Sequence, residues 1–258
     1  MKGIIAADQA VRSARLAFVA GVNLEYHETN TPHDQEVHYV RSQTQRVFWI
    51  LLGLSVVFSA LILLIMPAEK TIGSIIKVVY LHGALSRAGM LGLMAAGAVG
   101  LAYLIRPQPA LARWTKALAL SGWAYWTAHF IVSMPATRFT WGPWIAWGEP
   151  RVTMTLQIML VGLAVIAVSW LVADERFAAA ANLLLATAVV VLAARTGVLR
   201  HPLDPIGQSP SGLLRWIYLA LLVPVVGSMV LVAWRLTQTR KPAPAIASEI
   251  QSENREHR

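Results

Sequence analysis

The feature that most constrains the fold of this chain is a series of apolar runs, each long enough to cross a bilayer. A transmembrane helix takes about 20 residues, and helices satisfy their own backbone hydrogen bonds in lipid. We therefore predict an all-α, polytopic membrane protein with six transmembrane helices. The predicted helices cover residues 47–66, 75–105, 113–135, 152–173, 177–198 and 213–236.

The composition favours the same class. Of 258 residues, 56% are hydrophobic and only 14% are charged, whereas soluble domains carry roughly a quarter charged residues. We expect one six-helix transmembrane domain over residues 47–236. It follows a polar cytoplasmic segment over residues 1–46 and precedes a disordered cytoplasmic tail over residues 237–258. The first 23 residues lack an uninterrupted apolar core, so we do not expect a cleaved signal peptide.

The net charge of +9 fits a membrane protein and does not require a nucleic-acid partner. Basic residues fix the orientation of helices and contact anionic lipid headgroups. Most Lys and Arg residues lie on the side that holds both predicted termini. This distribution predicts N-in and C-in topology in a bacterial cytoplasmic membrane, with the connection between the third and fourth helices facing outward. The chain has no cysteine, which excludes disulfides and thiolate ligands.

That outward connection is rich in tryptophan. Residues 140–148 contain Trp141, Trp144 and Trp147, and Arg138 and Arg151 flank them. Gly and Pro residues make a regular helix unfavourable there. Because Trp in a loop has no core to fill, its flat surface suits a lipid interface or a flat ligand. Guanidinium groups bind carboxylates well, so haem, with its propionates, fits the pattern.

Three histidines fall in the predicted outer half of the domain: His82, His129 and His201. Imidazole is a strong ligand for haem iron. For a histidine alone, a hydrogen-bonded position near a helix end is the more ordinary interpretation, although His82 lies within apolar sequence, where polar groups are usually functional. His129 has a third possibility, since Trp126 lies one turn earlier and favours packing. The grouping of the three residues with the tryptophans is what indicates a haem site.

These residues carry a resemblance to a known family. The segment from Trp141 to Trp147, followed by Arg151-Val152-Thr153, resembles the tryptophan-rich WWD signature of the haem-handling proteins of cytochrome c maturation. Tyr80-Leu81-His82 is similar to the haem-ligand motif in the second helix of that family. Residues 205–216 resemble the stretch that leads into the last helix of its CcmC branch. Gly148-Glu149 stands where the family has Asp.

The resemblance implies a function and a set of roles. His82 and, by position, His201 become the axial ligands of a non-covalent b-type haem, and His129 competes with His201. Trp141, Trp144 and Trp147 form a platform, while Arg138 and Arg151 bind propionates. Haem is then presented to a haem chaperone or an apocytochrome, without bond chemistry by the protein. Related proteins also partner an ABC transporter and small membrane subunits.

Two other functions stay open. A haem-binding or structural membrane subunit of a larger respiratory-type complex would keep the same fold for electron transfer or as a scaffold. A transporter for another ligand is the third alternative, although Asp and Glu are nearly absent from the predicted helices, which disfavours proton coupling. No catalytic triad, carboxylate pair or phosphate-binding loop is present, so hydrolytic activity has no support.

Overall fold

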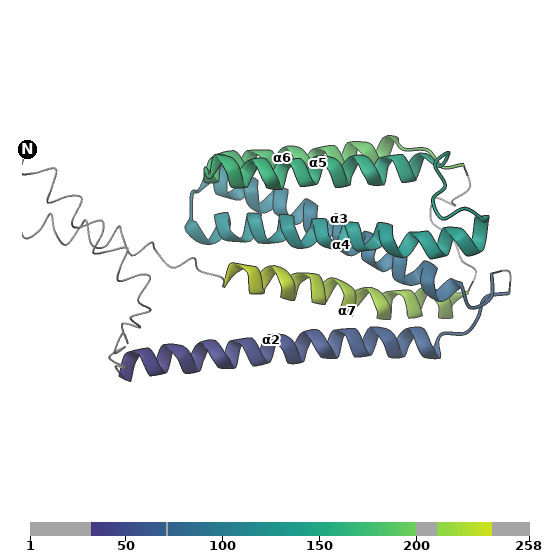
Figure 1. Ribbon diagram of the computed structural model, residues 1–258, viewed down its shortest axis with the longest axis horizontal. Helices are drawn as coiled ribbons and strands as arrows, with labels where there is room; N and C mark the ends of the chain where they lie inside the picture. The colour runs from purple at the N-terminus through teal and green to yellow at the C-terminus, as the bar shows by residue number, and fades with distance from the viewer. Residues whose placement is uncertain (1–31, 71, 200–210, 239–258) are drawn as a thin grey trace, which may run out of the picture. The chain divides into compact units, whose positions relative to one another are not determined.

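The structure is a computed structural model that describes residues 32–70, 72–199 and 211–238. The chain divides into two compact units, residues 1–45 and 46–258. The described elements are long helices (Figure 1). They are α2 (Pro32–Ile65), α3 (Ile76–Ile105), α4 (Pro109–Trp141), α5 (Pro150–Val172), α6 (Glu175–Arg195) and α7 (Gly212–Thr237).

Five of these helices are long and apolar enough to cross a membrane: α2 over Gln43–Ile65, α3, α5, α6 and α7. The prediction of a multi-pass, all-α membrane protein is therefore confirmed. The exception among the six is α4, which has 33 residues but is less apolar. Because α4 is a central helix, polar residues such as Thr115, Ser121 and His129 are buried against protein. The sixth span stays a prediction.

Two helices extend beyond their predicted bounds. We predicted that the third helix would end at Pro135, but α4 continues through this residue to Trp141. Proline is tolerated inside transmembrane helices because neighbouring groups satisfy the freed carbonyl. The stop is Gly142, whose φ of 96° is a conformation that glycine adopts readily. Likewise α2 begins at Pro32 and not near residue 47, with proline in the first turn where its missing N–H is harmless.

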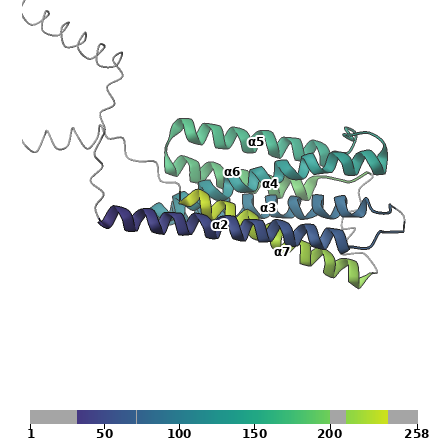
Figure 2. The same cartoon turned by 60° about the horizontal axis from the view of Figure 1, so that its bottom comes forward.

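The centre of the bundle is the α3–α4 pair (Figure 2). Glycines allow the two backbones to approach closely. A Cβ on Gly89 would lie 2.6 Å from the backbone nitrogen of Trp126, and one on Gly92 would lie 2.7 Å from the Gly122 Cα. Further along α3, Gly97 and Gly100 make the same kind of approach to α6. Small residues on α3 therefore allow close packing against two neighbouring helices.

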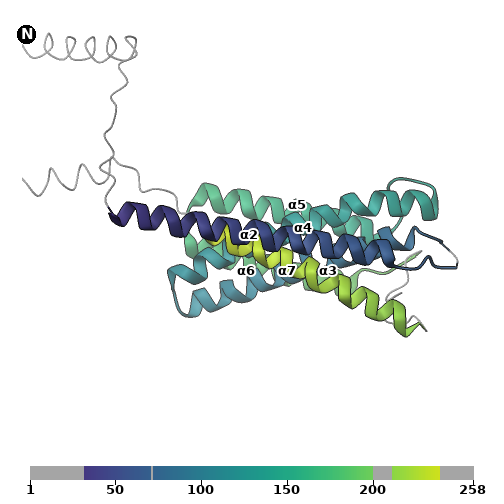
Figure 3. The same cartoon turned by 90° about the horizontal axis from the view of Figure 1, so that it is seen from below.

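The other helices flank this pair. In residues 46–238, α5 and α6 lie on one side, and α2 and α7 lie on the other (Figure 1; Figure 3). The antiparallel order places the connections 66–75, 142–149 and 196–199 at one end of the bundle. We call this the Trp-loop end. The connections 106–108 and 173–174 lie at the opposite end.

Candidate functional site

The structure brings two of the predicted site histidines into contact. His82, in the second turn of α3, and His129, on α4, have ring centroids 4.6 Å apart and ring planes inclined by 33°. The Nδ1 atom of His82 lies 3.2 Å from the backbone oxygen of His129. Within α4, the Nδ1 atom of His129 lies 3.0 Å from the backbone oxygen of Trp126. We call these two residues the histidine pair.

The two hydrogen bonds define the tautomer of each ring. A carbonyl oxygen only accepts a hydrogen bond, so both Nδ1 atoms act as donors. In a neutral imidazole the lone pair is then on Nε2, which is the atom that binds a metal. Metal-ligating histidines commonly donate their other N–H to a backbone carbonyl in this way. The chemistry of His82 therefore fits a haem ligand. Because the two rings pack side by side, they do not face one iron from opposite sides.

Trp126 packs against His129 of the histidine pair. Its side chain is 2% exposed, and its ring centroid lies 4.7 Å from that of His129. The indole Nε1 donates a hydrogen bond of 3.2 Å to the backbone oxygen of Thr155 on α5. His129 itself is 6% exposed. Contacts from three helices thus hold the pair in place, and Gly89 makes room for them on α3.

The Trp loop consists of residues 142–149, which are not helical. Trp144 and Trp147 are 58% and 68% exposed, so they present large aromatic surfaces outside the protein core. The expected lack of regular helix is correct for this segment but wrong for Trp141, which is the last residue of α4. Arg138 is exposed, and its guanidinium donates a hydrogen bond to the backbone oxygen of Gly142.

A buried carboxylate fixes the end of this loop. Glu149 is 3% exposed, and its Oε1 accepts a hydrogen bond of 3.3 Å from the backbone nitrogen of Leu199. Its own nitrogen donates to the Ala146 oxygen over 2.9 Å. The Trp loop is thereby tied to the segment that follows α6. We had regarded Glu149 only as a departure from the family pattern, since acidic residues in loops are mostly solvated.

The remaining predicted site residues are more peripheral or fall outside the described chain. Arg151 is half-buried in the first turn of α5. His201 lies outside the described residues. Within the described ranges, no group of three or more His, Asp or Glu residues is arranged to hold a metal ion. The contacts therefore join His82 to His129, while Trp144, Trp147 and Arg138 occupy the same end of the bundle.

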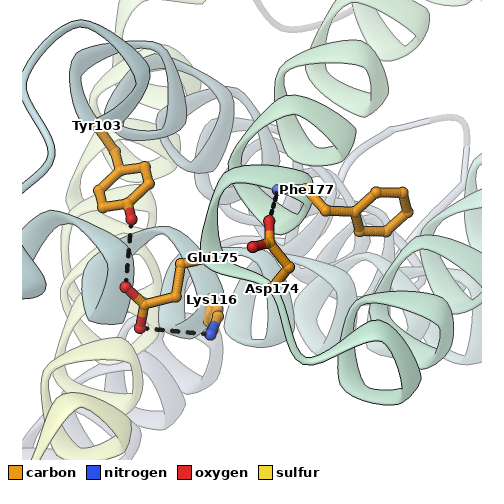
Figure 4. Close-up of polar contacts among 5 residues, drawn as sticks. All are labelled: Tyr103, Lys116, Asp174, Glu175 and Phe177. Carbon is orange, nitrogen blue, oxygen red and sulfur yellow. Dashed lines mark hydrogen bonds and ion pairs between the residues drawn. The ribbon is translucent and has the colours of Figure 1, made fainter.

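The opposite end carries a polar cluster of a different kind (Figure 4). Glu175 accepts a hydrogen bond of 3.3 Å from the Tyr103 hydroxyl and lies 3.8 Å from the Lys116 ammonium. Asp174 caps α6 by accepting from the Phe177 nitrogen over 2.6 Å. These contacts join α3, α4 and α6 beside the short α5–α6 connection.

No known family model matches the sequence, and no curated protein is significantly similar to it.

Proposed function

We propose that this membrane protein binds haem at its Trp-loop end and presents it to an acceptor during cytochrome c maturation. The observation that supports this function most directly is the hydrogen bond from His82 Nδ1 to the His129 oxygen. It places a histidine inside an apolar helix with its ligating nitrogen defined, and polar groups in such positions are usually functional. The resemblance to the WWD family supports the same interpretation.

In this proposal each residue has a distinct role. His82 would bind the haem iron, and His201 would supply a second ligand. His129 is a positioning residue, because its backbone oxygen orients the His82 ring and its own ring packs against it. Trp144 and Trp147 provide the platform for the macrocycle. Arg138 and Arg151 bind the propionates.

The exposed position of the platform residues Trp144 and Trp147 favours a protein that delivers haem over one that retains it. A haem that serves electron transfer is best buried, whereas cargo must remain accessible to the protein that receives it. Trp144 and Trp147 are more than half exposed, so a ring bound against them stays accessible. Bound haem supplies the iron to which the histidines bind, and the chain contributes binding and orientation. This is a non-enzymatic function at the extracytoplasmic face of the membrane.

Haem content of the purified, full-length protein tests the ligand assignment. We expect His82→Ala to lose most of the bound haem and its Soret absorbance. The platform is tested by the double variant Trp144→Ala/Trp147→Ala, with Trp170→Ala as the matched control. Trp170 is 69% exposed on α5, near the opposite end, so it shares any general anchoring role in lipid. Unchanged haem in the His82 variant contradicts the proposal.

A haem-transfer assay distinguishes haem delivery from the second candidate function, that of a haem-binding subunit of a respiratory-type complex. Haem-loaded protein is mixed with an apocytochrome or a haem chaperone, and the movement of haem is followed by absorbance. We expect transfer. A stable, redox-active low-spin spectrum with no transfer favours the subunit and rejects delivery.

A further inference from the structure

The inward face of α2 has an unusual order of side-chain sizes. Its more buried residues recur every three or four positions, as expected for one face of a helix. Large residues occupy both ends of this face: Phe48 near its start, and Ile62 and Met66 at its end, all less than 10% exposed. The middle positions are Ser55 and Ser59. Near Ile62 the helix therefore packs on the bundle core, whereas the small Ser55 and Ser59 leave space beside it.

A cavity of about 400 Å³ lies at these serines, between α2 and helices α3, α4 and α7. We call it the α2 cavity. Its wall includes Leu85 of α3, and Ala124 and Tyr125 of α4. Ser55 lies near the middle of the α2 span, which covers Gln43–Ile65. The cavity is thus at the depth of membrane hydrocarbon, and its size is typical of ligand cavities, which range from about 300 to 1,000 Å³.

The hydroxyl groups in the wall donate their hydrogen bonds within the protein. Ser55 and Ser59 donate to carbonyl oxygens of their own helix over 2.9 and 2.8 Å. Tyr125 donates to Ser228 over 2.6 Å, and Ser228 donates to the Val225 oxygen over 2.8 Å. No Lys, Arg, His, Asp or Glu lines the cavity. Its surface therefore suits hydrocarbon and offers no charge to a headgroup.

We propose that the α2 cavity binds one acyl chain of a membrane phospholipid. The outward face of α2 beside it is strongly apolar, with Leu54, Val57 and Phe58 each more than 50% exposed, so lipid chains surround the helix at this depth. An apolar cavity without an occupant leaves its lining atoms without dispersion partners. A single chain that enters from the side restores those contacts, while its headgroup stays at the interface.

Photolabelling in a bilayer tests this site. The full-length protein is reconstituted into phosphatidylcholine bilayers in which one acyl chain carries a diazirine, then irradiated and mapped by peptide mass spectrometry. We expect adducts on Tyr125 and Ser228 to exceed those on Leu160. Leu160 is 68% exposed in the middle of α5 and reports random contact with lipid. Labelling of the cavity wall that does not exceed labelling of Leu160 overturns the proposal.

Matched variants show whether the labelled chain occupies the cavity. Ser59→Phe fills it and should abolish labelling of Tyr125 and Ser228. Val57→Phe adds the same ring to the outward face of the same helix and should leave labelling unchanged. Circular dichroism checks folding, and Ala124→Leu replaces Ser59→Phe if that variant does not fold. Persistent labelling of the wall in a folded, filled variant overturns the proposal.

Two further measurements distinguish other occupants. Tyr125→Phe removes the hydroxyl but keeps the ring, so an acyl chain should still label Ser228. Loss of labelling in this variant would indicate a ligand with a polar head and reject the acyl chain. Light scattering on the same samples gives the oligomeric state. A dimer that Ser59→Phe dissociates would mean that a helix of a second copy fills the cavity.

Discussion

The close approach of α3 and α4 gives the most quantitative prediction. A Cβ on Gly89 would lie 2.6 Å from the Trp126 nitrogen and 2.8 Å from its Cα, and ordinary contact begins at 3.4 Å. The obstructing atoms are backbone, so they do not rotate away. In Gly89→Ala the two helices must therefore separate locally by about 0.8 Å, the shortfall in the closer contact.

This separation reaches the histidine pair, which bridges the same two helices less than two turns away. The His82–His129 hydrogen bond of 3.2 Å would lengthen to about 4 Å, beyond hydrogen-bonding range. Overpacking costs about 1–3 kcal/mol, and a lost hydrogen bond costs about 0.5–1.5 kcal/mol. We therefore expect Gly89→Ala to lower the free energy of unfolding by about 2–4 kcal/mol. Each kcal/mol corresponds to a fall of roughly 2–4 °C in Tm for a chain of this size.

The assay is unfolding of the detergent-solubilised protein followed by circular dichroism, with haem content measured on the same samples. Gly53→Ala is the control, because a Cβ at Gly53 meets no atom within 4 Å and alanine favours a helix. Equal stability of the two variants would refute the packing argument. A destabilised Gly89→Ala that binds haem normally would refute the role of the His129 oxygen in orienting His82.

Four further substitutions test other parts of the bundle, each by its effect on Tm. Glu149→Ala should lower the stability by about 0.5–1.5 kcal/mol, because the Leu199 N–H loses its hydrogen-bond acceptor, whereas Glu149→Gln keeps a carbonyl oxygen and should be milder. Trp126→Phe should cost about 1–3 kcal/mol, because the Thr155 oxygen loses its donor; an unchanged Tm would contradict this bond. Gly142→Val should cost about 1–2 kcal/mol, because φ is positive there. Lys116→Ala should change the stability by at most about 1 kcal/mol, since its ion pair is partly exposed.

The sequence was a good guide to the helices and a weaker one to their ends. The predicted runs match the six helices, and five of these have the length and hydropathy of a membrane span. The predicted end of α4 at Pro135 is wrong, because the helix continues to Trp141 and ends at Gly142, where φ is positive. The lower hydropathy of α4 reflects polar residues that this central helix buries against protein.

The site was predictable as a set of residue types but not as a geometry. The sequence places His82 and His129 on separate helices, and only the spacing of α3 and α4 brings the rings to 4.6 Å. That spacing depends on Gly89, which sequence patterns link to packing in general but not to Trp126. The role of Glu149 is hidden from the sequence for a related reason: its hydrogen-bond donor, the Leu199 N–H, lies fifty residues away in the chain.

The packing of α2 has a consequence for the order in which the bundle assembles during synthesis. The α3–α4 hairpin has a connection of only 106–108 and a glycine-mediated contact of its own, so it can form once both helices have been made. Ile62 of α2 and Met66, which follows the helix, share their core with Tyr80 of α3 and Tyr218 of α7. The first described helix to be made therefore completes its contacts only when the last one arrives.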